Sequence, residues 1–91
     1  PHSVAIGIEK FDESKPGRVT IDAVLFVDQE SQKGILIGKE GSMIKAIGTK
    51  ARLSIQEMME CPVTLNLNVK LKKNWRKDPA FLKSLGLALP N

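Results

Sequence analysis

The chain has few residues of the kinds that build disulfides, metal sites or nucleophilic active sites. Cys61 is its single cysteine, which excludes an internal disulfide, favours a reducing compartment and predicts a small buried side chain. His2 is the single histidine and has no partner at metal-ligand spacing, so no metal site is expected. Ser42 and Ser54 lack a histidine base, which leaves nucleophilic catalysis without support.

Aromatic residues and long apolar runs are also scarce. Three Phe, one Trp and no Tyr disfavour an RRM, which stacks bases on aromatic side chains. Trp75 is interpreted as a packing residue, because a lone Trp in a small domain usually supplies core area. No apolar run is long enough for a membrane span and no signal pattern opens the chain. A soluble, intracellular domain is therefore expected, and the start at Pro1 leaves open that it belongs to a longer protein.

The charge of the chain is unevenly distributed. The 91 residues carry a net charge of +4, and 42% of them are hydrophobic, which suits one small domain with a modest core. Residues 1–32 hold three basic and six acidic side chains, a net −3, whereas residues 33–91 hold eleven basic and four acidic ones, a net +7. Clustered Lys and Arg attract phosphates, so the basic part indicates a polyanionic partner. A solvated basic surface is the alternative, and charge alone favours it.

Alternation of apolar residues indicates a small sheet. The segment "DESKPG" supplies charge, Pro and Gly between the first two strands and is typical of a hairpin turn. Val24 and Phe26 lie off the apolar face of the second strand, which predicts that the end of this strand is covered on both sides. The strands are expected at about 4–10, 18–27 and 62–72.

Helical periodicity and capping residues predict three helices. Ser31 could cap the first, although the β-branched residues of "QKGILI" suit a strand equally well. In the second helix, apolar residues recur at steps of three and four. Asp78 as N-cap, Pro79 at the first helical position and Gly86 beyond the last turn define the third. These helices are expected at about 32–37, 42–59 and 79–85.

A glycine-rich stretch, "GILIGKEGSMIKAIG" at residues 34–48, allows two interpretations. A P-loop needs Gly, four residues and Gly-Lys-Ser/Thr, but the spacing from Gly34 is one residue short, and Glu40 stands where a hydroxyl should follow the Gly-Lys pair. The tetrapeptide GKEG at residues 38–41, between two helical segments, instead fits the GXXG loop of a KH domain. In that loop, bare backbone and helix N-terminal amides can hold a single-stranded sugar-phosphate chain.

The surrounding text is similar to a known family. "DQESQKGILIGKEGSMIKAIGTKAR", "IQEMM", "PVTLNLNVKLKKNWR" and "LKSLGL" resemble, in order and spacing, the C-terminal KH domain of the Era family of ribosome-assembly GTPases. The resemblance covers nearly the whole chain and implies an α+β, type II KH fold: a three-stranded mixed sheet with helices packed on one face. The helix that precedes the first strand in the family has no counterpart in this sequence, and Asn68 stands where the family often has Trp.

The candidate RNA-binding residues follow from the loop and from the resemblance. Lys39 and Lys45 are expected to supply charge for phosphate, whereas Glu40 more naturally faces solvent. Ile37, Ile44 and Ile47 could form an aliphatic floor for bases, but Ile47 suits the core equally well. Gly48 is better explained by close packing of two helices. Polar edges near Leu65 to Val69 are expected to read the Watson–Crick groups of bases. The full set is Lys33, Ile37, Gly38, Lys39, Glu40, Gly41, Ser42, Ile44, Lys45, Ile47, Gly48, Arg52, Lys70 and Lys72.

The resemblance also implies a wider function. It implies that the domain binds single-stranded RNA at the 3′ end of 16S ribosomal RNA, with the small ribosomal subunit as partner. No catalytic residue is expected in this chain, and GTP and magnesium are expected only in a preceding domain. A monomer in the bacterial cytoplasm is expected, with the parent protein peripheral to the inner membrane and an organelle as an open alternative. The competing hypothesis is a structural or protein-docking module whose basic face meets an acidic partner protein.

Overall fold

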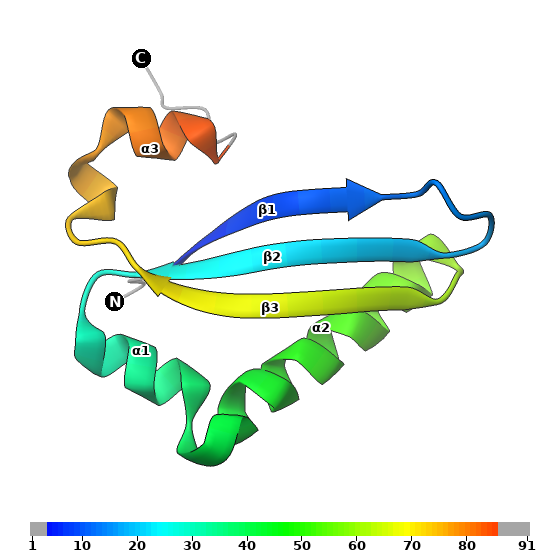
Figure 1. Ribbon diagram of the computed structural model, residues 1–91, viewed down its shortest axis with the longest axis horizontal. Helices are drawn as coiled ribbons and strands as arrows, with labels where there is room; N and C mark the ends of the chain where they lie inside the picture. Colours follow the sequence, from blue (N-terminus) through cyan, green and yellow to red (C-terminus); the bar gives the residue numbers. More distant parts are fainter. Residues whose placement is uncertain (1–3, 86–91) are drawn as a thin grey trace.

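The computed structural model describes residues 4–85, which form a three-stranded sheet with three helices (Figure 1). The strand order is β1-β2-β3, with β1 antiparallel and β3 parallel to the central strand β2. The predicted α+β fold with a mixed sheet is confirmed. The elements are β1 (Val4–Asp12), β2 (Val19–Val27), α1 (Glu30–Ile37), the 3-10 turn η1 (Lys39–Gly41), α2 (Ser42–Met59), β3 (Val63–Leu71), the 3-10 turn η2 (Trp75–Lys77) and α3 (Pro79–Ser84).

The main core lies between α2 and one face of the sheet. Val19 and Ile21 of β2 and Val63 of β3 form its buried centre, because alternate residues of neighbouring strands point to the same face. Ile55, Met59, Cys61 and Leu65 pack against this centre. The free thiol of Cys61 is half-buried, so it is more exposed than the buried side chain that was predicted. The amphipathic face of α2 is thereby fixed against β3, which positions the site described below.

The opposite face of the sheet is covered at one end by α3. The rings of Phe26 and Phe81 meet edge to face, with centroids 4.8 Å apart and planes at 87°. Val24, on the same face, has no exposed surface. In Figure 1, α1 and α2 therefore lie on one side of the sheet and α3 on the other. The resemblance implied helices on one face of the sheet. The additional cover by α3 on the other face agrees with the apolar pair Val24 and Phe26, which predicted that the end of β2 is covered on both sides.

Helix α1 begins earlier than the sequence predicted, at Glu30 rather than near residue 32. The side-chain oxygen Oε1 of Gln32 accepts hydrogen bonds from the backbone N–H groups of Asp28 and Gln29, each at 3.1 Å. This capping arrangement makes Gln29 the N-cap of α1, so Ser31 lies inside the first turn and is not the N-cap. The segment "QKGILI" is helical, which resolves the ambiguity between helix and strand.

Other element ends differ less from the sequence expectations. The first strand runs to Asp12 after a bulge between Ile8 and Lys10. Hydrogen bonds from Ser14, whose N–H lies 2.8 Å from Oδ1 of Asp12, lower the pKa of that carboxyl. At α3, Oδ1 of Asp78 accepts from the N–H of Phe81 at 3.0 Å, as expected of an N-cap. The expected stop at Gly86 lies outside the described residues.

The apolar face of β1, which carries Val4, Ile6 and Ile8, is exposed. The register pairs it with the residues of β2 that face α2, yet α2 does not cover it. The buried residues of β1, Ala5 and Gly7, lie on its other face. A methyl group added at Gly7 would lie 2.8 Å from Cδ2 of Leu85. On the exposed face of β1, the exposed fractions are 38% for Val4, 59% for Ile6, 59% for Ile8 and 50% for Phe11.

Within residues 4–85, no helix is both long and apolar enough to span a membrane.

Candidate nucleic-acid interface

The turn between α1 and α2 is built on two glycines with positive φ. Gly38 has φ 73° and ψ 178°, a region open essentially to glycine alone, and its N–H donates to the carbonyl of Gly34 at 2.9 Å to close α1. A Cβ at Gly38 would lie 2.7 Å from Cβ and 2.9 Å from the backbone N of Met43. Gly41 has φ 75°, but a Cβ there would meet nothing within 4 Å. Gly38 is therefore required sterically, whereas Gly41 is required by its torsion angle alone.

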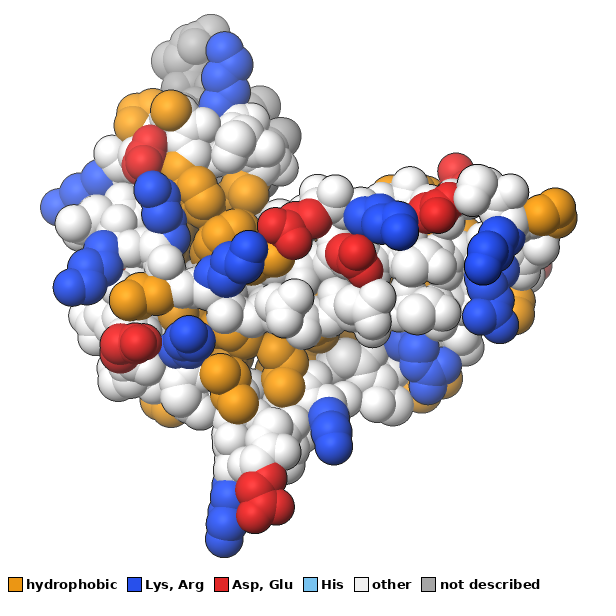
Figure 2. Space-filling view, in the orientation of Figure 1, with side chains coloured by type: hydrophobic (Ala, Val, Ile, Leu, Met, Phe, Trp, Pro, Cys, Tyr) orange, Lys and Arg blue, Asp and Glu red, His pale blue; other side chains and the backbone are white. Residues whose placement is uncertain are grey.

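Between these glycines, Lys39 and Glu40 are exposed, and Glu40 adopts the left-handed conformation with φ 55°. Figures 1 and 2 show that this turn protrudes from the body of the protein. No side chain caps the first turn of α2, which starts at Ser42 after the N-cap Gly41. The N–H of Gly41 donates to the carbonyl of Gly38 at 3.2 Å and the N–H of Ser42 to the carbonyl of Lys39, so these two amides are engaged within the turn. The positive dipole end of α2 still favours an anion next to this turn.

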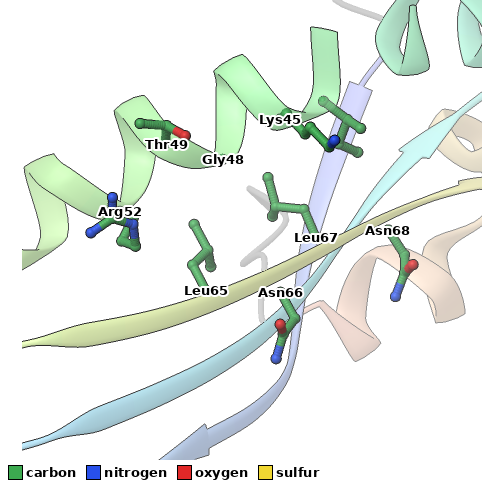
Figure 3. Close-up of a pocket in the computed structure, with 9 residues that line it drawn as sticks. Lys45, Gly48, Thr49, Arg52, Leu65, Asn66, Leu67 and Asn68 are labelled. Carbon is green, nitrogen blue, oxygen red and sulfur yellow. The ribbon is translucent and has the colours of Figure 1, made fainter. Parts of the chain in front are cut away.

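A groove of about 540 Å³ runs between α2 and β3, beginning next to this turn (Figure 3). Leu65 and Leu67 project from β3 toward α2, whereas the side chains of Asn66 and Asn68 project away from it. The helix side of the groove is open at Gly48, where an added Cβ would lie 3.5 Å from Cδ1 of Leu67. The groove thus has an apolar floor, and its lining residues are Ile44, Lys45, Gly48, Thr49, Arg52 and Leu65 to Asn68.

Backbone groups of β3 face the groove as well. The N–H of Lys72 donates to the carbonyl of Val27 at 2.8 Å, so even-numbered positions direct their backbone groups to β2. The N–H of Val63 instead donates to Oε1 of Gln56 on α2, at 3.1 Å. By this alternation, Leu65 and Leu67 also direct N–H and C=O to the edge away from β2. This edge can pair with the polar edges of bases, as the sequence analysis expected.

The structure brings together most of the candidate residues. Those from Gly38 to Ser42 form the turn and the start of α2, while Ile44, Lys45, Gly48 and Arg52 line the groove. Gly48 faces Leu67 of the sheet and not a second helix, so the prediction that Gly48 allows close packing of two helices is wrong. Three further candidates are half-buried and lie outside the groove lining: Lys33, Ile37 and Ile47.

Lys70 and Lys72 belong to the opposite face of the sheet, which corrects their grouping with the groove. Lys70 is an even-numbered residue of β3, whose odd-numbered side chains point to α2, and Lys72 follows the last residue of that strand. Nζ of Lys70 lies 3.5 Å from Oε2 of Glu9. Nζ of Lys72 lies 3.6 Å from Oδ2 of Asp78.

The side chain of Asn68, which stands where the family often has Trp, points away from α2, although Asn68 is one of the residues that line the groove. Its neighbour Asn66 donates from Nδ2 to Oδ1 of Asp22 at 2.7 Å. Within the part of the chain that the structure describes, no group of three or more His, Cys, Asp or Glu could hold a metal ion. Thr49, which lines the groove, and Gln56, which bonds to Arg52, were not among the predicted residues, although each follows Lys45 or Arg52 by four positions on the same side of the helix.

The glycine turn, the long helix and the parallel edge strand define a KH fold, and the sequence pattern of the KH domain family matches residues 1–76, so the chain belongs to this family. Within it, the chain is similar to GTPase Era. It is 53% identical over 90 residues to Era of Nitratidesulfovibrio vulgaris, covering 97% of this chain and 29% of that protein. It is 50% identical over 88 residues to Era of Thermotoga petrophila, covering 96% and 29%.

Solved structures show the same relationship. The chain is 35% identical to Aquifex aeolicus Era bound to GDP.AlF4-, with a TM-score of 0.86 over 96% of this chain and 30% of that one. It is also 35% identical to Era in complex with MgGDPNP and nucleotides 1506–1542 of 16S ribosomal RNA, with a TM-score of 0.87 and the same coverage of 96% and 30%. The resemblance to the KH domain of the Era family is therefore confirmed. The chain spans less than a third of the length of these Era proteins.

Proposed function

We propose that this domain binds single-stranded RNA, with the sugar-phosphate backbone on the turn at residues 38–41 and the bases in the groove between α2 and β3. The bare main chain at Gly38 and Gly41 carries this proposal, because no Cβ at these two positions keeps a phosphate away from the positive dipole end of α2. Lys39 and Lys45, both exposed, add positive charge on the two sides of the turn. The apolar floor formed by Leu65 and Leu67 suits the faces of unpaired bases.

The RNA we propose is the 3′ end of 16S ribosomal RNA, bound during ribosome assembly, with the small ribosomal subunit as partner. The structural likeness to Era in complex with nucleotides 1506–1542 of 16S ribosomal RNA supports this choice. The net charge of +7 over residues 33–91 supports a polyanionic ligand. We further propose that the parent protein hydrolyses GTP with magnesium in a preceding domain, as its relatives are GTPases. A cytoplasmic, monomeric protein with a peripheral association with the inner membrane completes this proposal.

The proposal is tested by changing Lys39 and Glu40 together to Asp. Two carboxylates on the turn would repel phosphate, so single-stranded RNA should bind at least about tenfold more weakly, a loss of about 1.4 kcal/mol. The fold should be retained, since Asp tolerates the left-handed conformation that Glu40 adopts. Fluorescence anisotropy with labelled oligonucleotides from the 1506–1542 RNA measures the affinity. The matched control changes Lys50 and Glu57, exposed residues of α2 outside the groove lining, to Asp.

Equal affinities of the loop variant and the wild-type protein would refute RNA binding at this turn. The competing role as a protein-docking module is separated by competition at constant salt. Unlabelled single-stranded RNA should displace the labelled strand, whereas duplex RNA and an acidic polypeptide should compete weakly. Salt titration alone does not discriminate, because both roles depend on charge.

A Gly48→Ala substitution should separate stability from binding. Alanine in the interior of α2 should raise the free energy of unfolding by up to about 1 kcal/mol. The added methyl would make an ordinary contact with Leu67, 3.5 Å away, but it would occupy the open wall of the groove. RNA affinity should therefore fall while the urea midpoint rises. A rise in both quantities would show that bases do not approach this wall.

A further inference from the structure

Gln56 provides a fixed hydrogen-bond acceptor beside the groove. Its Oε1 accepts from the backbone N–H of Val63 at 3.1 Å and from Nη1 of Arg52 at 3.1 Å. Val63 is buried in the core, with 5% of its surface exposed, so the main chain at the start of β3 holds this oxygen in place. The guanidinium of Arg52 is thereby tied, through one neutral amide, to the backbone of the strand that forms the other wall.

Arg52 stands at the end of the groove that lies away from the glycine turn. Ten residues of α2 separate it from Ser42, a rise of about 15 Å along the helix. Figure 3 shows Lys45 toward the turn and Arg52 at the other end, with Leu65 near Arg52. Lys45 is thus placed near the backbone-binding turn, whereas Arg52 is placed beside the apolar floor.

The charge of Arg52 is not neutralised within the domain. Among residues 4–85, no carboxylate forms an ion pair with it, and its recorded partner is the uncharged side chain of Gln56. With Nη1 engaged by Gln56, the other N–H groups of the planar guanidinium stay available to a ligand. An arginine held in one orientation loses less conformational entropy on binding than a free one.

We propose that Gln56 is a positioning residue, which holds the Arg52 guanidinium so that it donates hydrogen bonds to the base of the nucleotide farthest from the glycine turn. This inference rests on the proposed binding of single-stranded RNA in the groove. A base, and not a phosphate, is the expected acceptor because Arg52 lines the groove beside Leu65, where bases lie, while the backbone is held at residues 38–41. Base acceptors such as O6 and N7 of guanine suit the guanidinium.

The test combines protein variants with RNA that lacks single bases. Gln56→Met keeps the length of the side chain but removes the acceptor, Gln56→Glu keeps an acceptor, and Arg52→Met removes the donor. Each is titrated with oligonucleotides from the 1506–1542 RNA that carry one abasic nucleotide at successive positions. On intact RNA, Gln56→Met and Arg52→Met should each weaken binding by about tenfold, and the double variant should bind no more weakly than Arg52→Met. Gln56→Glu should stay within about twofold of the wild-type protein.

One abasic position should abolish the effect of both substitutions, because the base that Arg52 contacts is then missing. The inference is overturned if Arg52→Met weakens binding but Gln56→Met does not, or if the loss is the same at every abasic position. A purely structural role of Gln56 would lower the urea midpoint without this dependence on position. If Gln56→Met fails to fold, Gln56→Asn, which withdraws the oxygen by one methylene, replaces it in the same series.

The loop variant distinguishes this inference from the proposed function. If the loop variant, with Lys39 and Glu40 changed to Asp, loses RNA binding while the Arg52 and Gln56 variants bind normally, only the positioning role fails. If the loop variant binds like the wild-type protein, the proposed site for the RNA backbone fails.

Discussion

Replacing Gly38 with alanine is expected to lower the free energy of unfolding by about 2–3 kcal/mol, because φ 73° with ψ 178° strains any residue that has a Cβ. The new methyl would also lie 2.7 Å from Cβ and 2.9 Å from the backbone N of Met43, and a backbone atom cannot rotate away. Relief of this clash would displace the start of α2, where we place the phosphate. RNA affinity should therefore fall with stability, as measured by urea unfolding and fluorescence anisotropy.

Gly41→Ala is the matched control. Its φ of 75° is left-handed too, but a methyl there would meet nothing within 4 Å, so the cost should be about 1–2 kcal/mol. The difference between the two substitutions reports the contact with Met43 together with the strain of ψ 178° at Gly38, since Gly41 has ψ 14°. Equal losses of stability at the two positions would contradict the steric role of Gly38.

Replacing Trp75 with alanine should lower the free energy of unfolding by about 3–5 kcal/mol, the usual cost of removing a large buried aromatic. Trp75 is 8% exposed in the turn η2, between β3 and α3, and the guanidinium of Arg76 lies 5.6 Å from the centre of its ring. Thermal unfolding measures the loss. At temperatures where the variant is folded, its affinity for RNA should equal that of the wild-type protein.

Trp75→Phe gives the corresponding control, with a smaller loss of stability because most of the apolar area is retained. Weakened RNA binding by a fully folded Trp75 variant would show instead that the ring stacks on a base. That result would contradict the packing role that its burial indicates.

The parts of the site that depend on local spacing could be predicted from the sequence. The glycine spacing predicted the turn, and in "VTLNLNVKLK" apolar and polar residues alternate, so that the apolar ones share one face of β3. The same alternation places Lys70 and Lys72 on the other face, although both were grouped with the candidate RNA-binding residues. The charge of these lysines is a weaker guide to their role than their position in the alternation, because each of them forms an ion pair with a carboxylate of the domain.

Features that depend on distant contacts could not be predicted. The buried face of β1 consists of Ala5 and Gly7, which were not recognisable as core residues because their burial depends on the opposite face of the sheet. The cap of α1 uses glutamines at positions 29 and 32 and not the usual Ser or Thr with Glu, so Ser31 was the better match to the common pattern. The double hydrogen bond to Gln56 required the position of Val63 relative to α2, which only the folded chain defines.

The parallel pairing of β2 with β3 has a consequence for how the fold constrains the interface. Two parallel strands need a long crossover that returns the chain to the starting end of the sheet, and here that return is α1, the glycine turn and α2. The segment that we assign to RNA contact is thus also the segment that gives the sheet its connectivity. It cannot be shortened or replaced like a surface loop, so binding and architecture are constrained by the same residues.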